Sequence, residues 1–187
     1  MTTHPKRLDI VVLALALGIG FLPELATAEV SNRSASGFVV NVTLNVAAPP
    51  EAVYASLTRH LSEWWDAAHT YSGDSKNMSI VPEPGGCFCE ALADGGGVQH
   101  AIVVNVAPGK LLRMSGALGP LQAGAVTGTL SWQFEKSGSA DSKLVLTYVV
   151  GGYLSGGLDK VADAVDMVLT RQAELLKRHA EQARGRR

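Results

Sequence analysis

The stretch VTGTLSWQFEKSGSADSKLVLTYVV, residues 126–150, alternates apolar and polar side chains on both sides of a polar segment at 137–142. This period of two indicates two strands with one buried face each, and the short segment between them indicates an antiparallel pair. The later stretch LDKVADAVDMVLTRQAELLKRHAEQ, residues 158–182, has helical spacing and predicts a helix of about 25 residues. Together they predict an α+β domain whose long C-terminal helix covers the concave face of an antiparallel sheet.

The sequence before residue 126 adds strands and two short helices. Residues 38–46 alternate in the same way, and the Pro-Glu pair at 50–51 suits the first turn of a helix. A second short helix is expected at 63–66, followed by strands at 78–81, 87–92, 98–106 and 111–115. Alternation along 98–106 places these residues on one face: Val98, His100, Ile102, Val104 and Val106. The sheet is therefore expected to be curved, with about six to seven strands wrapped around the long helix.

The N-terminal 28 residues have the pattern of a secretory signal peptide. Lys6 and Arg7 precede an apolar run at 10–22, and Ala26-Thr27-Ala28 supplies the small residues that signal peptidase accepts. The apolar run of about 13 residues is shorter than the ~20 needed to span a bilayer. Cleavage after Ala28 is predicted, with an uncleaved N-terminal anchor as the alternative. The protein would then be periplasmic or secreted, with no stable membrane span after cleavage.

The predicted domain organisation follows from these boundaries. Residues 29–36 are mostly polar and small and are expected to be flexible, the folded domain covers 37–183, and 184–187 form a basic tail. Lys plus Arg number 16 and Asp plus Glu 17, and this balance provides no basic field for a nucleic-acid backbone. A single domain, acting as a monomer or weak dimer, fits the length of 187 residues.

Cysteine and histidine spacing give little support for metal chemistry. Cys87 and Cys89 lie on one face of a predicted strand, with Cα atoms about 6.6 Å apart, at the upper limit of disulfide geometry. Two small buried or half-buried thiols are the favoured interpretation, and a bridge is the alternative. Neither the C-x-C pair nor the spacing of His60 and His69 matches a metal motif, so no metal and no cofactor is expected.

Several motifs resemble those of one protein superfamily. They are PPEAVY at 49–54, the Trp pair at 64–65, EPGGCFCE at 83–90, Val106-x-Pro108, and the Thr-rich strand that ends in Trp132 and Phe134. In this order they resemble the SRPBCC or START-like superfamily, which has the helix-grip fold of the birch-pollen-allergen type. The branch that they resemble most contains ATPase-activator homologues and polyketide-cyclase-like proteins. The resemblance covers about residues 37–182.

The resemblance implies a deep pocket between the sheet and the long helix that holds an apolar small molecule. It does not imply one activity, and activation of a cytosolic chaperone ATPase does not suit an exported chain. The residues expected to line the pocket are Trp64, Trp65, Phe88, Glu90, His100, Met114, Trp132, Tyr148, Tyr153 and Leu169. No catalytic residue is assigned.

The polar candidates each have a functional and a structural interpretation. His100 can orient a ligand or move a proton, or it can be a satisfied core histidine, which is the commoner case. Glu90 can be a pocket carboxylate with a raised pKa, or it can lie on the strand surface. His69 can guard a pocket mouth, although a surface-loop position is favoured.

Three functions remain, and each makes a structural prediction. A carrier for a hydrophobic small molecule, which is favoured, needs a hollow pocket with one or two polar groups. A cyclase- or dehydratase-like enzyme needs a His, Glu or Asp pair that converges in the pocket within hydrogen-bond reach. A protein-interaction module needs a filled core and an exposed apolar patch.

Overall fold

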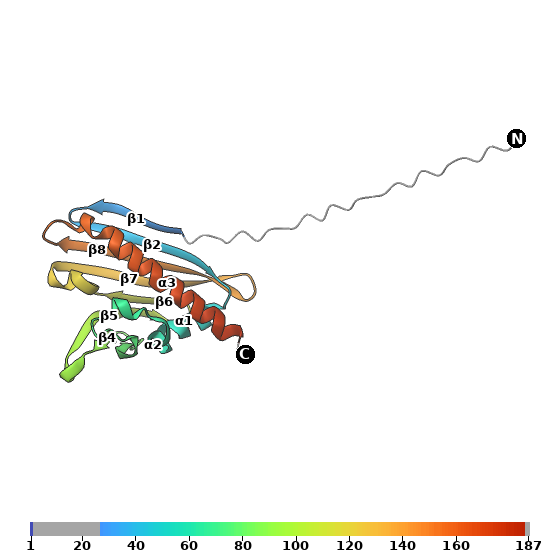
Figure 1. The fold of residues 1–187 in the computed structure, drawn as a ribbon, viewed down its shortest axis with the longest axis horizontal. Coiled ribbons are helices and arrows are strands. Elements are labelled where there is room, and N and C mark those ends of the chain that lie inside the picture. The colour runs from blue at the N-terminus through green and yellow to red at the C-terminus, as the bar shows by residue number, and fades with distance from the viewer. Residues whose placement is uncertain (2–26, 186–187) are drawn as a thin grey trace.

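The computed structural model describes Met1 and residues 27–185, and it has the expected α+β architecture (Figure 1). The strands are β1 Thr27–Ser34, β2 Gly37–Val46, β3 Met78–Ile80, β4 Cys87–Ala91, β5 Gly97–Ala107, β6 Leu111–Ser115, β7 Ala125–Ser137 and β8 Asp141–Tyr153. The α-helices are α1 Pro50–Arg59, α2 Leu61–Trp64 and α3 Ala162–Gly185. Five 3₁₀ turns join them: η1 Ala67–His69, η2 Ser75–Asn77, η3 Ala93–Gly95, η4 Gly119–Ala123 and η5 Leu158–Lys160.

All eight strands form one curved antiparallel sheet in the order β1-β2-β8-β7-β6-β5-β4-β3. From β3 to β8 each strand pairs with the next one in sequence, as expected for a meander joined by short turns. Strand β2 joins the sheet by pairing with β8, from Gly37 opposite Gly151 to Val46 opposite Ser142. The helix-grip fold is thus confirmed, with one more strand than expected.

The additional strand is β1, and it corrects the expectation that residues 29–36 are flexible. Glu29 and Val30 pair with Asn41 and Val40 of β2, and Val30 packs against the core. An edge strand is held by backbone hydrogen bonds to its neighbour, so a polar, small-residue sequence can form one without an apolar stripe. The predicted signal peptide lies mostly at 2–26, outside the described residues. Cleavage after Ala28 would remove the first two residues of β1.

Helix α3 lies across one face of the sheet (Figure 1) and buries a stripe of small and apolar residues. Its buried positions are Ala162, Leu169, Gln172, Ala173, Leu176 and Ala180. No helix among residues 27–185 is both long and apolar enough to span a membrane.

The end of α3 differs from the expected basic tail at 184–187. The helix continues to Gly185, and Arg184 donates hydrogen bonds to the backbone oxygens of Ala47 (2.8 Å) and Ala140 (3.3 Å). Arg184 also pairs with Asp141 at 3.1 Å. A cation at a helix C-terminus satisfies free carbonyl groups nearby, and here it connects α3 to the β7–β8 turn.

The single face expected for Val98 to Val106 is wrong, because two irregularities interrupt β5. Pairing shifts register opposite Phe88 and Cys89 of β4, and again between Val103 and Asn105. Each inserted residue reverses which side chains point inward. His100 and Ala101 are consequently both buried, and Val104 is 49% exposed.

The same region corrects the interpretation of the cysteines. Cys87 and Cys89 form a disulfide, and their Cα atoms are 5.3 Å apart. This distance is shorter than the ~6.6 Å of a regular strand and lies well within disulfide range. Both are half-buried on the face opposite Phe88 and Glu90, which point into the core.

Candidate functional site

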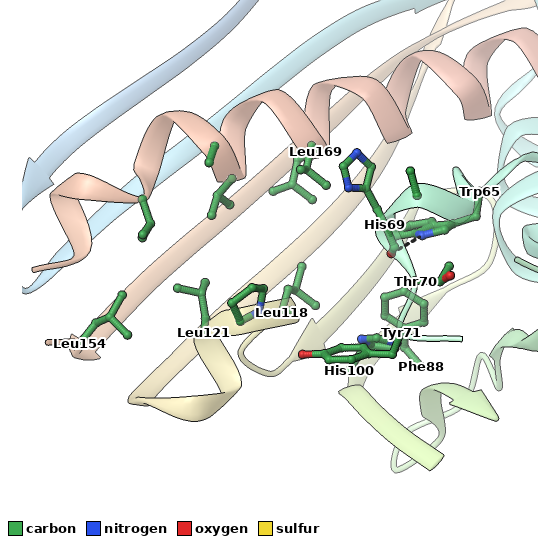
Figure 2. A pocket seen from close by; sticks show the side chains of 17 residues that line it. Trp65, His69, Thr70, Tyr71, Phe88, His100, Leu118, Leu121, Leu154 and Leu169 are labelled. Carbon is green, nitrogen blue, oxygen red and sulfur yellow. Dashed lines mark hydrogen bonds between the residues drawn. The ribbon is translucent and has the colours of Figure 1, made fainter. Parts of the chain in front are cut away.

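A cavity of about 530 Å³ opens between α3, the η1 segment, the η4 loop and the ends of β4 and β5 (Figure 2). Its walls are mainly apolar. Helix α3 contributes Ala164, Val165, Val168 and Leu169, and Val161 directly before it also lines the cavity. The opposite side contributes Leu118, Gly119, Pro120, Leu121 and Leu154. The end near the short helices is formed by Trp65, Ala68, His69, Thr70, Tyr71, Phe88 and His100. Its size and apolar walls are typical of a small-molecule site.

The polar groups of the cavity gather at one end. Figure 2 shows His69, Tyr71 and His100 on one side, and Leu154 at the far side. The Thr70 hydroxyl already donates to Ala67 O at 2.8 Å, and the Trp65 indole N–H donates to His69 O at 3.2 Å. Among the lining residues that the structure describes, none is a lysine, an arginine or a carboxylate.

A buried pair, Glu90 and His100, stands behind this polar end. His100 Nε2 lies 3.1 Å from Glu90 Oε2, and their side chains are 7% and 0% exposed. Two backbone N–H groups also donate to the Glu90 carboxylate, from Tyr71 at 3.0 Å and from Ser72. Charge-assisted hydrogen bonds of this kind satisfy a buried carboxylate. Glu90 therefore fixes both the His100 ring and the segment that carries Tyr71.

The electrostatics of the pair favour an ionised Glu90 and a neutral His100. Burial raises the pKa of Glu90, but hydrogen bonds from Ser72, Tyr71 and His100 outweigh it and lower that pKa overall. Desolvation lowers the pKa of His100, and the neighbouring Glu90 opposes this only partly. The expected raised pKa for a pocket carboxylate is thus wrong in direction, because hydrogen bonding to the charged form dominates.

Four of the ten expected pocket residues line the cavity, and they are Trp65, Phe88, His100 and Leu169. Phe88 forms an edge contact with Trp65 (ring centroids 5.4 Å apart) and packs on His100 (5.0 Å). His69 lines the cavity and is also exposed, so it lies at the mouth of the cavity and not in a surface loop away from it.

The other six expected residues lie elsewhere. Trp132, Met114 and Tyr148 are buried in the packed core. Trp64 is buried too and donates its indole N–H to Ser56 O at 2.8 Å. Tyr153 is 71% exposed, and Glu90 is reached only through His100. Helix α1 packs on β7, with Tyr54 edge-on to Phe134 at 5.8 Å, so this part of the inner face is covered by α1 rather than by an open cavity.

Sequence reasoning missed most of the cavity wall, namely the η4 loop, Leu154 and, apart from His69, the η1 segment. One signal was present in the η4 region, because residues 116–124 are too long for a tight hairpin turn between two strands. The short segment at 67–71 carries no comparable pattern.

Tyr148 connects the core to the η4 loop although it does not line the cavity. Its hydroxyl donates to Gly116 O and accepts from Leu118 N, both at 3.0 Å. Burial raises the pKa of Tyr148 to about 12. The ring passes over Gly128, where an added Cβ would lie 2.4 Å from a ring carbon. Glycine at 128 therefore makes room for the tyrosine that holds the loop.

One cluster elsewhere has metal-ligating residue types. His60 Nδ1 lies 2.7 Å from one oxygen of Glu63, and His179 Nε2 lies 3.3 Å from the other. These contacts lower the pKa of Glu63. A metal on Nε2 would require the proton on Nδ1 of His179, which is buried with no acceptor among residues 27–185. The cluster is better described as a carboxylate bridging two imidazoles.

Comparison with known proteins gives a fold likeness. No family model matches the sequence, and no curated protein matches it. The di-domain ARO/CYC StfQ from the steffimycin biosynthetic pathway superposes with a TM-score of 0.56 at 17% identity, over 82% of this chain and 53% of that one. A putative uncharacterized protein from Rhizobium leguminosarum gives 0.54 at 18% identity, over 85% and 99%. The Mll3558 protein from Rhizobium loti gives 0.56 at 18% identity, over 74% and 94%. The chain therefore shares the helix-grip fold with these proteins.

Proposed function

We propose that this protein binds a hydrophobic small molecule, lipid-like or polycyclic, and carries it in the cavity between the sheet and α3. The observation that carries the proposal is an apolar cavity of about 530 Å³ with polar side chains gathered at one end. Such a site orients a mainly apolar ligand by a few polar contacts. The open cavity argues against the alternative of an interaction module with a filled core.

We also propose that the protein is exported and belongs to the ATPase-activator-homologue and polyketide-cyclase-like branch. The signal-peptide pattern at 1–28 supports export, and the Cys87–Cys89 disulfide suits an oxidising compartment. The motif at 83–90 supports the branch, because it forms the turn into β4 and places Phe88 in the cavity wall.

The binding function is tested by titration with N-phenyl-1-naphthylamine, a neutral apolar fluorophore. Saturable binding at one site per chain is expected, together with a change in the fluorescence of Trp65, which lines the cavity. Val165→Phe should fill the cavity and weaken binding at least tenfold. Met167→Phe is the matched control, because Met167 is on the same helix but is 64% exposed and lies outside the cavity. Absence of saturation, or equal effects of the two variants, would reject the proposal.

A cyclase- or dehydratase-like enzyme is the second candidate function. The specific observation in its favour is the Glu90–His100 pair, since such an enzyme needs a pair within hydrogen-bond reach at the pocket. The structural neighbour StfQ, an ARO/CYC, agrees with this candidate. Hydrogen–deuterium exchange at the α-carbon of 2-tetralone in D₂O, followed by NMR, measures such activity. If the wild type accelerates this exchange and His100→Gln does not, the result supports an enzyme. If the wild type does not accelerate the exchange, the carrier function is the one supported.

A further inference from the structure

Three polar side-chain groups of the cavity have no hydrogen-bond partner among the described residues, namely the His69 ring, the Tyr71 hydroxyl and Nδ1 of His100, whereas the Thr70 hydroxyl is already bonded to Ala67 O. His69 and Tyr71 are exposed at the mouth. His100 lines the cavity but is only 6% exposed, because the rings of Phe88 (5.0 Å between ring centroids) and Tyr71 (6.0 Å) lie against its ring. Of these three groups, only His100 can therefore form a buried hydrogen bond with a ligand that enters the cavity.

The environment of His100 fixes which ring nitrogen carries the proton and which one is left as an acceptor. The ionised Glu90 carboxylate offers only acceptor oxygens, so the contact at 3.1 Å requires a proton on Nε2. A neutral imidazole has one proton, which leaves Nδ1 as a lone-pair acceptor. Nδ1 has no hydrogen-bond partner within the part of the chain that the structure describes. The free atom is thus an acceptor that needs a donor.

The charges around the cavity exclude an anionic head group. A carboxylate is itself only an acceptor, so it cannot bond to an unprotonated Nδ1. The described lining residues include no lysine or arginine to neutralise it, and the negative charge of Glu90 lies directly behind His100. Burying an unpaired charge in such a site is strongly unfavourable. Fatty acids and other anionic amphiphiles are therefore poor ligands.

We propose that the ligand is neutral and carries a hydroxyl group at one end, as in a sterol, a phenol or an enol, which donates to Nδ1 of His100. Its apolar body then lies along α3 toward Leu154, where the cavity wall is apolar (Figure 2). This inference rests on the proposed binding function and adds the polar chemistry of the ligand.

The test compares three probes with one ring system: 2-naphthol, naphthalene and 2-naphthoate. Calorimetric titration near pH 8 keeps His100 neutral and 2-naphthoate charged. One hydrogen bond to a buried acceptor should make 2-naphthol bind about three- to tenfold more tightly than naphthalene. 2-Naphthoate should bind at least about tenfold more weakly than 2-naphthol, because its charge is buried without a partner.

Three variants assign the effect to an atom. His100→Phe removes the Nδ1 acceptor and keeps an aromatic ring against Phe88 and Tyr71, so the advantage of 2-naphthol over naphthalene should disappear. Glu90 retains the two backbone N–H donors of Tyr71 and Ser72 in this variant. Tyr71→Phe and His69→Phe remove the other two free groups and should preserve the advantage. Persistence of the advantage in His100→Phe would overturn the assignment to His100.

The remaining outcomes separate the inference from the proposed function. Equal affinities for 2-naphthol and naphthalene, or a preference for 2-naphthoate, would overturn the inference and leave a binding cavity. Binding of none of the probes and none of N-phenyl-1-naphthylamine would overturn both.

If His100→Phe does not fold, a pH series on the wild type replaces it. Protonation of His100 removes the acceptor, so the advantage of 2-naphthol should fall as the pH drops through the pKa of His100, which burial lowers. The other titratable groups around His100 are Glu90 on β4, Tyr71 and His69, whereas the cavity faces of α3 and η4 carry none. Repeating the series on His69→Gln separates the two histidines, and an advantage independent of pH would overturn the inference.

Discussion

Tyr148→Phe is expected to loosen the η4 loop from the core without creating a cavity. The change removes one oxygen atom, which donates to Gly116 O and accepts from Leu118 N at 3.0 Å each. Tyr148 is fully buried, so the freed backbone N–H and carbonyl groups remain beneath the loop with no partner. The aromatic ring and its packing are kept.

The expected magnitude follows from these two hydrogen bonds. Leaving a buried donor and acceptor unsatisfied costs about 1–3 kcal/mol of unfolding free energy, with partial relief where water enters the loop. For a domain of this size that corresponds to a Tm lower by roughly 3–9 °C. Since Leu118 and Leu121 line the cavity, affinity for N-phenyl-1-naphthylamine should fall as well.

Urea titration followed by circular dichroism measures the loss, and Tyr54→Phe is the matched control. Tyr54 is partly buried edge-on to Phe134, and its hydroxyl has no hydrogen bond to any described residue. Tyr54→Phe should change the unfolding free energy by less than about 0.5 kcal/mol. Equal effects of the two substitutions would refute the role assigned to the Tyr148 hydroxyl.

Alkaline pH provides a second measurement on the same group. Because burial raises the pKa of Tyr148 from 10.0 to about 12, its contribution is fully present below pH 10 and is lost as the pH rises toward 12. The wild type should therefore lose more stability than Tyr148→Phe over this range. Parallel losses in the two proteins would contradict the buried, neutral phenol.

Further predictions concern the core and the buried pair. Gly128→Ala should cost about 1–3 kcal/mol in urea titration, because its Cβ would meet the Tyr148 ring at 2.4 Å; a neutral result would show that the ring can move. Trp132→Ala should cost about 3–5 kcal/mol and leave N-phenyl-1-naphthylamine affinity nearly unchanged, since Trp132 is 1% exposed and lies outside the cavity. Acid should destabilise the fold, because the pKa values of His100 and Glu90 are both lowered on folding. Their contributions to the unfolding free energy are fully present above pH 6.5 and pH 4.5, respectively, and are lost as the pH falls through the lowered pKa values. A stability that is flat between about pH 7 and 4 would contradict this direction.

The apolar character of the candidate site was predicted from the sequence, but its position in the fold was not. The resemblance implied an apolar pocket under the long helix, and His100, Phe88, Trp65 and Leu169 do line the cavity. Trp132 lies at an inward-facing position of the period-two pattern, as a cavity residue would. Helix α1 packs against its strand, so Trp132 is part of the packed core. Alternation reports which face of a strand is inward, and it contains no information on whether another element fills the space beyond.

The pairing of Glu90 with His100 depends on features that no local pattern contains. Ten residues separate them on two strands, and a register shift next to Phe88 sets which side chains of β5 point inward. Likewise, the polar sequence of β1 gives no strand signal, and its pairing with β2 exists only once β2 is placed in the sheet.

The sequence by itself determined the order of strands and helices, the antiparallel meander and the covering helix, because hydrophobic period and turn residues act over a few neighbouring positions. Only the tertiary structure decided the eighth strand, the Cys87–Cys89 bridge, the tether from Tyr148 to the η4 loop and the position of the cavity. The eighth strand, the tether and the cavity depend on distances between segments far apart in the chain, whereas the bridge depends on a local Cα distance that alternation alone does not report. Such distances follow from strand register, bulges and the volume left unfilled between α3 and the sheet, so they are fixed only when all the elements pack together.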